Sequence, residues 1–104
     1  MRVWSRFEWR QQSRLLDERE RLRRQRAELR TAATSRRGSE RHHVNDDEVT
    51  IRADAIEGWL AAVDEALERI DSGSYGRCVV CGSQIAEERL EALPAAAVCR
   101  SCVV

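Results

Sequence analysis

The chain has 104 residues, enough for one small domain, and its 35% charged residues, one proline and five glycines favour long charged helices over a compact globule. The net charge is zero but unevenly divided. Residues 1–45 hold 13 Arg and 6 acidic residues, a balance of +7, whereas residues 46–104 hold 5 Arg and 12 acidic residues, a balance of −7. Because the halves can neutralise each other, composition argues against a surface dedicated to polyanions.

The N-terminal residues are charged from Arg2 onward and lack the apolar core of a secretory signal. No apolar run approaches the roughly 18 residues that a membrane-spanning helix needs. We therefore expect a cytoplasmic protein with reduced cysteines and no membrane association. The aromatic residues Trp4, Phe7 and Trp9 are expected to cap a helix end by packing on the C-terminal cysteine-containing segment or, alternatively, to contact a partner.

Residues 8–33 are predicted to form a helix, because they are rich in Arg, Glu, Gln, Leu and Ala and contain no Gly or Pro. Their apolar seam is thin, with one leucine every seven residues, so the helix needs a partner helix. One face carries a stripe of arginines. It is either a nucleic-acid contact or a solvated face neutralised by acidic neighbours, and the acidic second half favours the latter. The seam leucines are Leu15, Leu22 and Leu29, and the stripe is Arg19, Arg23, Arg26 and Arg30.

Residues 34–46 are polar, contain Gly38 and are predicted to form a connecting loop. Residues 47–71 are predicted to form the second helix, because apolar residues alternate spacings of four and three along them. Gly73 then suits a left-handed C-cap. The seam of this helix is Val49, Ala53, Ile56, Leu60, Val63, Leu67 and Ile70.

The two helices are predicted to fold back on each other as an antiparallel two-helix coiled-coil hairpin. If the turn centres near residue 41, the numbers of facing residues sum to about 82, as for Leu22 and Leu60. This register predicts ion pairs of Arg14 with Glu68, Arg10 with Asp71 and Arg24 with Glu57. It also brings Trp4 and Phe7 to the Gly73–Cys78 end. A parallel dimer through the second helix is the alternative.

All four cysteines lie in the last quarter of the chain, as two Cys-x-x-Cys pairs separated by 17 residues. This spacing is typical of a zinc site, in which four thiolates close a tetrahedron and leave no position open for water or substrate. We therefore expect one structural Zn²⁺ and no enzyme activity. Two disulfides or a redox Cys-x-x-Cys fit less well. The expected ligands are Cys78, Cys81, Cys99 and Cys102. A short helix is expected over 86–91, before Pro94, with Ile85, Leu90 and Val98 as a small core.

The run Ala66-Leu67-Glu68-Arg69-Ile70-Asp71-Ser72-Gly73-Ser74-Tyr75-Gly76-Arg77-Cys78-Val79-Val80-Cys81-Gly82 resembles the DksA/TraR family. So do Ile85, the run Arg89-Leu90-Glu91-Ala92-Leu93-Pro94, and the second cysteine pair. The resemblance covers about residues 60–102. It implies a mainly α fold, with a helical hairpin over residues 1–73 and a four-cysteine zinc finger over residues 74–104.

The resemblance also implies a function. Members of the family are transcription regulators that bind RNA polymerase directly rather than DNA and insert the hairpin into the secondary channel, where acidic residues at its tip act. The family's Asp-x-x-Asp-x-Ala tip motif has no clean match here, and Asp46 and Asp47 are the nearest candidates. We expect a monomer that binds polymerase. The alternatives are a zinc-stapled coiled-coil adaptor or dimer and a zinc-ribbon nucleic-acid binder.

Overall fold

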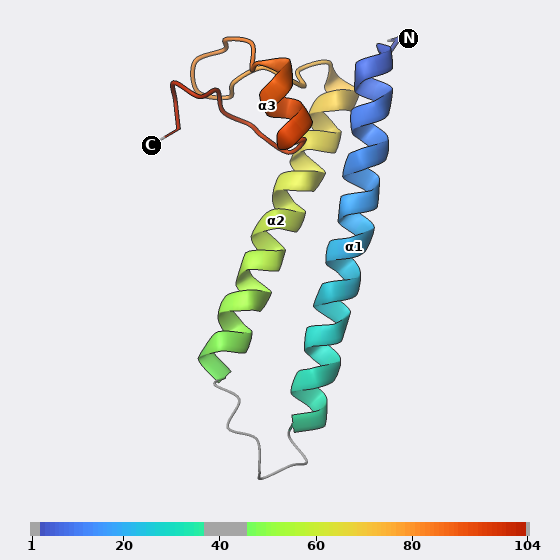
Figure 1. The fold of residues 1–104 in the computed structure, drawn as a ribbon, viewed down its shortest axis with the longest axis vertical. Helices are drawn as coiled ribbons and strands as arrows, with labels where there is room; N and C mark the ends of the chain where they lie inside the picture. Colours follow the sequence, from blue (N-terminus) through green and yellow to red (C-terminus); the bar gives the residue numbers. More distant parts are fainter. Residues whose placement is uncertain (1–2, 37–45, 104) are drawn as a thin grey trace.

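The structure, a computed structural model, describes residues 3–36 and 46–103, with the backbone alone for residues 32–36 and 46–47. Two long antiparallel helices, α1 (Arg6–Arg36) and α2 (Asp46–Ser72), form a hairpin, and the short helix α3 (Glu87–Ala92) belongs to a compact module at its base (Figure 1). In the described residues, β structure is limited to one isolated bridge between Arg77 and Gln84. The predicted mainly helical fold, a hairpin followed by a four-cysteine module, is confirmed.

Helix α1 begins two residues before the predicted start, because Ser5 and Glu8 cap it reciprocally. The Glu8 backbone N–H donates to the Ser5 hydroxyl over 3.1 Å, and the Ser5 N–H donates to the Glu8 carboxylate over 3.2 Å. Trp4 and Trp9, on either side of this pair of capping bonds, contact each other with ring centroids 4.5 Å apart and ring planes tilted by 53°. Together they form a capping box with a hydrophobic staple, which fixes the direction from which the chain enters the helix.

The predicted loop over residues 34–46 is shorter than expected at both ends. Helix α1 continues to Arg36 and α2 begins at Asp46, one residue before its predicted start. Residues 37–45 lie outside the described part of the chain, and with them His42 and His43. Helix α2 ends as predicted, because Gly73 adopts a φ of 86°. The Ser74 N–H then reaches back 2.9 Å to the Arg69 carbonyl, as in a Schellman cap.

The hairpin core lies along the predicted seam. Its buried residues are Leu15, Leu22, Ile56, Leu60, Val63, Ala66 and Ile70, with Leu29 and Leu67 partly buried beside them. The observed ion pairs follow a register that differs by one residue from the predicted one, in which the numbers of facing residues sum to about 82. Arg19 pairs with Asp64 over 3.4 Å, and Arg26 pairs with Glu57 over 3.2 Å. The residue numbers of each pair sum to 83.

The predicted ion pairs of Arg10, Arg14 and Arg24 are replaced by others. Arg26, not Arg24, contacts Glu57, since position 26 lies nearer the seam. Arg10 and Arg14 turn toward Glu91 of the cysteine module, which covers the base of the hairpin where Asp71 and Glu68 were expected. The arginine stripe is thus partly neutralised by α2, as the solvated-face interpretation predicts.

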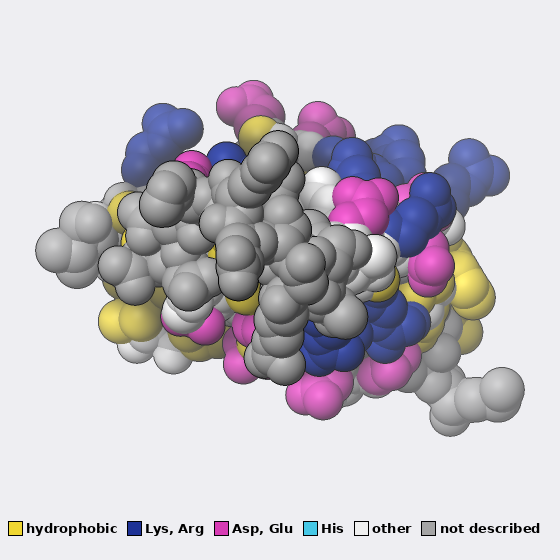
Figure 2. Space-filling model, turned by 90° about the horizontal axis from the view of Figure 1, so that it is seen from below, with side chains coloured by type: hydrophobic (Ala, Val, Ile, Leu, Met, Phe, Trp, Pro, Cys, Tyr) yellow, Lys and Arg dark blue, Asp and Glu magenta, His cyan; other side chains and the backbone are white. Residues whose placement is uncertain are grey.

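On the face seen from the tip end of the hairpin, the charge is mixed rather than divided by sign (Figure 2). Seen from below the hairpin, basic and acidic side chains alternate around the described residues (Figure 2). In the part of the chain that the structure describes, no helix has both the length and the apolar character needed to cross a bilayer. Phe7 lies 6.4 Å from Tyr75 between ring centroids, which places it against the cysteine module as predicted.

Candidate metal centre

Two tight turns present the cysteines. The first lies between paired backbone segments, in which the Ile85 N–H donates to the Gly76 carbonyl over 2.7 Å and the Cys78 N–H donates to the Ser83 carbonyl over 2.8 Å. Gly82 turns the chain back with a φ of 77°. In the second turn the Cys102 N–H donates to the Cys99 carbonyl over 3.0 Å. Each Cys-x-x-Cys pair thereby places its two sulfurs on one side of its turn.

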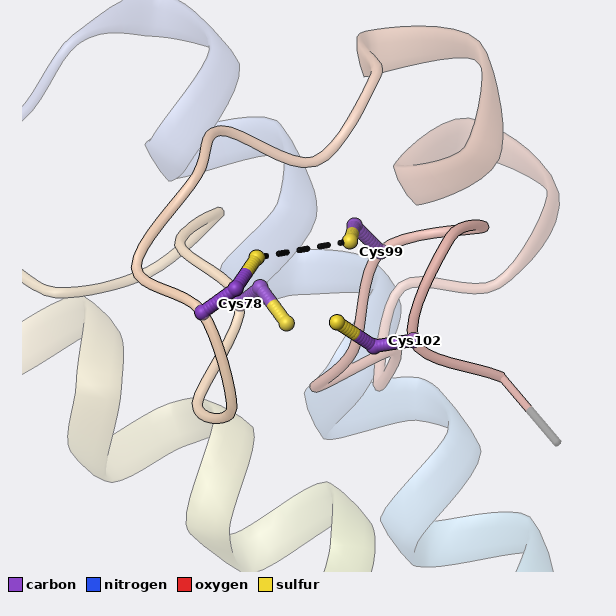
Figure 3. A group of neighbouring side chains, drawn as sticks. Cys78, Cys99 and Cys102 are labelled. Carbon is purple, nitrogen blue, oxygen red and sulfur yellow. Dashed lines mark hydrogen bonds between the residues drawn. The ribbon is translucent and has the colours of Figure 1, made fainter.

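The two turns face each other across a small gap. A backbone bond of 2.9 Å from the Val79 N–H to the Ala97 carbonyl joins them. The Sγ atoms of Cys78, Cys81, Cys99 and Cys102 all lie within 4.8 Å of one another, and their side chains converge on a common point (Figure 3). The Sγ atoms of Cys81 and Cys99 are 3.6 Å apart. All four cysteines are free thiols, so the disulfide alternative is absent from this structure.

The surroundings of the sulfurs favour negative charge on one side of the cluster and oppose it on the other. Backbone N–H groups of Cys99 and Cys81 point at the Cys78 sulfur and lower the pKa of that thiol to about 6. Hydrogen bonds from Ser83 lower the pKa of Cys81. The proximity of the other three sulfurs, Cys99 first, raises the pKa of Cys102 to about 12. A thiolate at Cys102 therefore needs a cation at the centre of the cluster.

Zinc fits this cluster. Four sulfurs at about 2.3 Å from a central Zn²⁺ in a tetrahedron lie about 3.8 Å from one another, close to the spacing found here. The N–H groups directed at Cys78 are the outer contacts that stabilise a ligating thiolate. Four soft sulfur donors also match the preference of zinc. A site filled by four protein ligands stabilises a fold and offers no position for a substrate.

The cluster rests on a small apolar core. Cys78, Ile85 and Leu90 are buried together, with Phe7, Tyr75 and Val98 partly buried around them. Val98 is thus nearer the edge of the core than expected. Gly76 has a φ of 84°, and a Cβ placed there would lie 3.4 Å from Leu90 Cδ1. The backbone of the first turn therefore passes close over α3.

A buried polar network joins this module to α1 and was not predicted from the sequence. Gln11 is fully buried, and its side-chain amide donates to the Tyr75 hydroxyl over 3.0 Å and to the Leu90 carbonyl over 2.8 Å. The Tyr75 hydroxyl donates in turn to the Pro94 carbonyl over 2.8 Å. Burial raises the pKa of Tyr75, which keeps its proton available for this bond. One signal was present: Gln11 precedes Leu15 by four residues and so occupies a seam position.

The predicted tip residues are far from the cysteine cluster along the chain. Asp46 opens α2 and Asp47 follows it, at the end of the hairpin opposite the cysteines (Figure 1). Their side chains lie outside the described residues. The structure therefore brings together the four predicted metal ligands and leaves the tip residues at a distance from them.

Comparison with known proteins identifies the module. Residues 73–102 match the family model of the prokaryotic dksA/traR C4-type zinc finger. An uncharacterised protein of Aquifex aeolicus (strain VF5) is 46% identical over 43 residues, which are 41% of this chain and 30% of that protein. The match thus spans less than a third of that relative's length. Over these residues the predicted resemblance to the DksA/TraR family is confirmed, including a zinc finger suited to one structural Zn²⁺.

The whole fold also has a counterpart. The structure of transcription factor DksA2 from Pseudomonas aeruginosa superposes with a TM-score of 0.78, covering 91% of this chain and 78% of that one. The two sequences are 22% identical, so this likeness concerns the fold. The helical hairpin with a module at its base is therefore an architecture that a transcription factor uses.

Proposed function

We propose, from the premise that residues 73–102 are a zinc finger of the dksA/traR type, that this protein regulates transcription by binding RNA polymerase directly. One observation carries the proposal: this type of finger sits at the base of a hairpin whose fold matches that of DksA2. The hairpin enters the secondary channel, and the finger holds its base. The role is one of binding, without catalysis by the chain itself.

The shape of the hairpin supports this proposal. Helix α2 has 27 residues and so extends about 40 Å at 1.5 Å per residue. Its buried seam runs from Ile56 to Ile70, so the two helices form a packed rod over the half nearer the finger, with Leu29 partly buried beside it. A rod of this length is long enough to probe a channel. Its far end is where α2 begins, at Asp46.

The mixed charge of the rod supports a protein partner over DNA. Arg19 and Arg26 of the basic stripe already pair with acidic side chains of α2. A DNA-binding helix would keep such side chains available for phosphates. We therefore propose that the protein acts without contacting DNA. We also propose that it acts in the cytoplasm and as a monomer.

We assign two sets of residues to this function. Cys78, Cys81, Cys99 and Cys102 hold one structural Zn²⁺, which stabilises the finger. Asp46 and Asp47 act at the tip, where carboxylates can approach the polymerase active site. The tip role rests on position along the chain, since α2 begins at Asp46.

A pull-down combined with a transcription assay tests the proposal. The zinc-loaded protein is expected to retain RNA polymerase at micromolar concentration and to change the lifetime of promoter complexes. The double variant Asp46→Ala/Asp47→Ala is expected to bind polymerase but to lose the effect on lifetime. The matched control is Asp17→Ala/Asp54→Ala, which removes two exposed carboxylates from the flanks of the rod and should behave as wild type.

Each alternative corresponds to a different result. Absence of polymerase binding would overturn the proposal. Affinity for DNA that falls steeply with salt would indicate a nucleic-acid binder instead. A stable dimer by light scattering would support the adaptor. Loss of lifetime regulation in the control variant as well would remove the tip assignment.

A further inference from the structure

Helix α3, like any α-helix, cannot satisfy its own C-terminal carbonyl groups. It has six residues, and the last four carbonyls of any α-helix lack partners within the helix. The Arg89 carbonyl accepts from the Leu93 N–H over 2.7 Å. The next two carbonyls accept from side chains of α1: Leu90 from the Gln11 amide over 2.8 Å, and Glu91 from the Arg14 guanidinium over 2.6 Å. Two residues of α1 thus cap carbonyls that lie 79 and 77 positions later in the chain.

The cap is a closed network. The guanidinium of Arg14 also donates to the Gln11 side-chain oxygen over 3.0 Å, so the two capping residues hold each other in place. Both N–H groups of the Gln11 amide are used, on Leu90 and on Tyr75. Gln11 is fully buried, and a buried amide that loses its hydrogen-bond partners destabilises the folded state, because no water replaces them. The buried position of the Gln11 side chain is therefore favourable only while the Leu90 carbonyl of α3 and the Tyr75 hydroxyl stay in their positions.

The positions of these acceptors depend on the cysteine cluster. The Leu90 side chain is buried against Cys78, and Tyr75 packs on the same small core three residues before Cys78. Pro94, which accepts from the Tyr75 hydroxyl, lies between α3 and the second cysteine pair. A finger of this size has too little core to hold these segments without its metal.

We propose that Gln11 and Arg14 are positioning residues that make the first turns of α1 depend on whether the zinc finger holds its metal. When zinc is bound, the carbonyls of Leu90 and Glu91 are fixed and the first turns of α1 are locked against the finger. When zinc is lost, the buried Gln11 amide loses its partners and these turns open. The inference rests on the zinc site of the proposed function but does not involve polymerase.

Hydrogen exchange with and without metal tests this dependence. The backbone amides of residues 10–15 in the full chain are expected to lose about tenfold or more of their protection when a chelator removes zinc, and to regain it when zinc is added back. Amides near Leu22, deeper in the hairpin, should change far less. Unchanged protection of residues 10–15 after confirmed loss of zinc would overturn the inference.

The variant Gln11→Met separates the polar network from general stability. It keeps the length and burial of the side chain but removes every hydrogen bond of the amide. We expect its residues 10–15 to be weakly protected with zinc bound and to respond little to the chelator. The matched control is Gln12→Met, one residue further along the helix and only half-buried, which should respond as wild type. A full wild-type response in Gln11→Met would contradict the proposal.

A second, milder variant keeps the test decisive if Gln11→Met folds poorly. Tyr75→Phe leaves the ring in place and removes the hydroxyl between Gln11 and Pro94, so it should reduce the chelator response of residues 10–15 by several-fold. A full wild-type response would overturn the inference. Zinc content is measured in the same samples. If the wild-type protein binds zinc but residues 10–15 do not respond to the chelator, this inference alone is overturned. If the wild-type finger binds no zinc, the metal site of the proposed function is overturned as well.

Discussion

The hairpin and the finger are stabilised in opposite ways. The hairpin distributes its stability over a seam of seven buried residues, with exposed ion pairs along its sides. Open surface grooves of about 440 and 570 Å³ are both lined by the exposed Trp59, and the second also borders residues 92–96 of the finger. Besides its four converging sulfurs, the described part of the finger buries only the side chains of Ile85 and Leu90, and backbone hydrogen bonds join its turns. One part can lose a contact and persist, whereas the other depends on a single centre.

This contrast has a physical reason. A helix satisfies its backbone internally, so a hairpin needs only enough apolar surface to hold two helices together. The finger consists mainly of turns, whose backbone groups must find partners across the module, and a chain this short buries too little apolar surface to order them. Metal binding supplies that missing free energy, on the order of 10 kcal/mol. The following experiments would break or sharpen the comparison.

The largest effect is expected from removing the metal site. The variant Cys99→Ser should lose stoichiometric zinc and the ordered structure of residues 74–103. The helical signal in circular dichroism should fall only modestly, because α3 contributes six residues against 31 in α1 and 27 in α2. Ser101→Ala, exposed between the two cysteines of the second pair, is the control. Collapse of the whole helical signal would show that the hairpin has no stability of its own.

A substitution in the seam should have the next largest effect. Leu15 is 1% exposed, and Leu15→Ala should lower the free energy of unfolding by about 2–4 kcal/mol. Leu16 is 39% exposed, so Leu16→Ala serves as the control and should cost well under half as much. Denaturant titration followed by circular dichroism measures both. Equal costs would mean that α1 packs on a different face in solution.

Two glycines offer a comparison of the same change in the two regions. In the finger, Gly76→Ala forces a side chain into a backbone with a φ of 84° against Leu90, and should destabilise by about 1–2 kcal/mol. In α2, a Cβ at Gly58 meets nothing within 4 Å, so Gly58→Ala should stabilise by up to about 1 kcal/mol. Thermal unfolding of zinc-loaded protein gives the sign of each effect. A gain in stability from Gly76→Ala would contradict the turn geometry.

The smallest effect is expected from the cross-helix ion pairs. The coupling between Arg26 and Glu57, measured by a double-mutant cycle to alanine, should be about 0.2–1 kcal/mol and should weaken as salt is added, because both side chains are partly exposed. Arg24 with Glu57, the pair predicted from the sequence, serves as the control and should show no coupling. A larger coupling for Arg24 would restore the predicted register.

Much of the architecture was predictable because its signals are local. The four-and-three spacing of α2 predicts its buried seam from Ile56 to Ile70, whereas the predicted seam residues Val49, Ala53 and Leu67 are only partly buried, and Ala66 is buried beside Leu67. The cysteine spacing predicts the sulfur cluster, and Gly73 predicts the end of α2. The early start of α1 was also readable, since Ser5 and Glu8 have capping-box spacing between two tryptophans. The cross-helix ion pairs could not be predicted in the same way, because a shift of one residue in the helix register gives every arginine a different acidic partner.

The sequence by itself determined the two helices, the metal-binding character of the four cysteines and the family of the finger. These follow from periodicities and spacings that act within a few residues of one another. Only the tertiary structure decided how the finger sits on the hairpin, because that depends on Gln11 and Arg14 meeting the carbonyls of Leu90 and Glu91. A backbone carbonyl is the same in every residue. The side-chain pattern therefore does not predict which unpaired carbonyl will accept a hydrogen bond from a distant side chain. The four cysteines mark the predicted metal site, and Gln11 and Arg14 connect that site to the rest of the molecule.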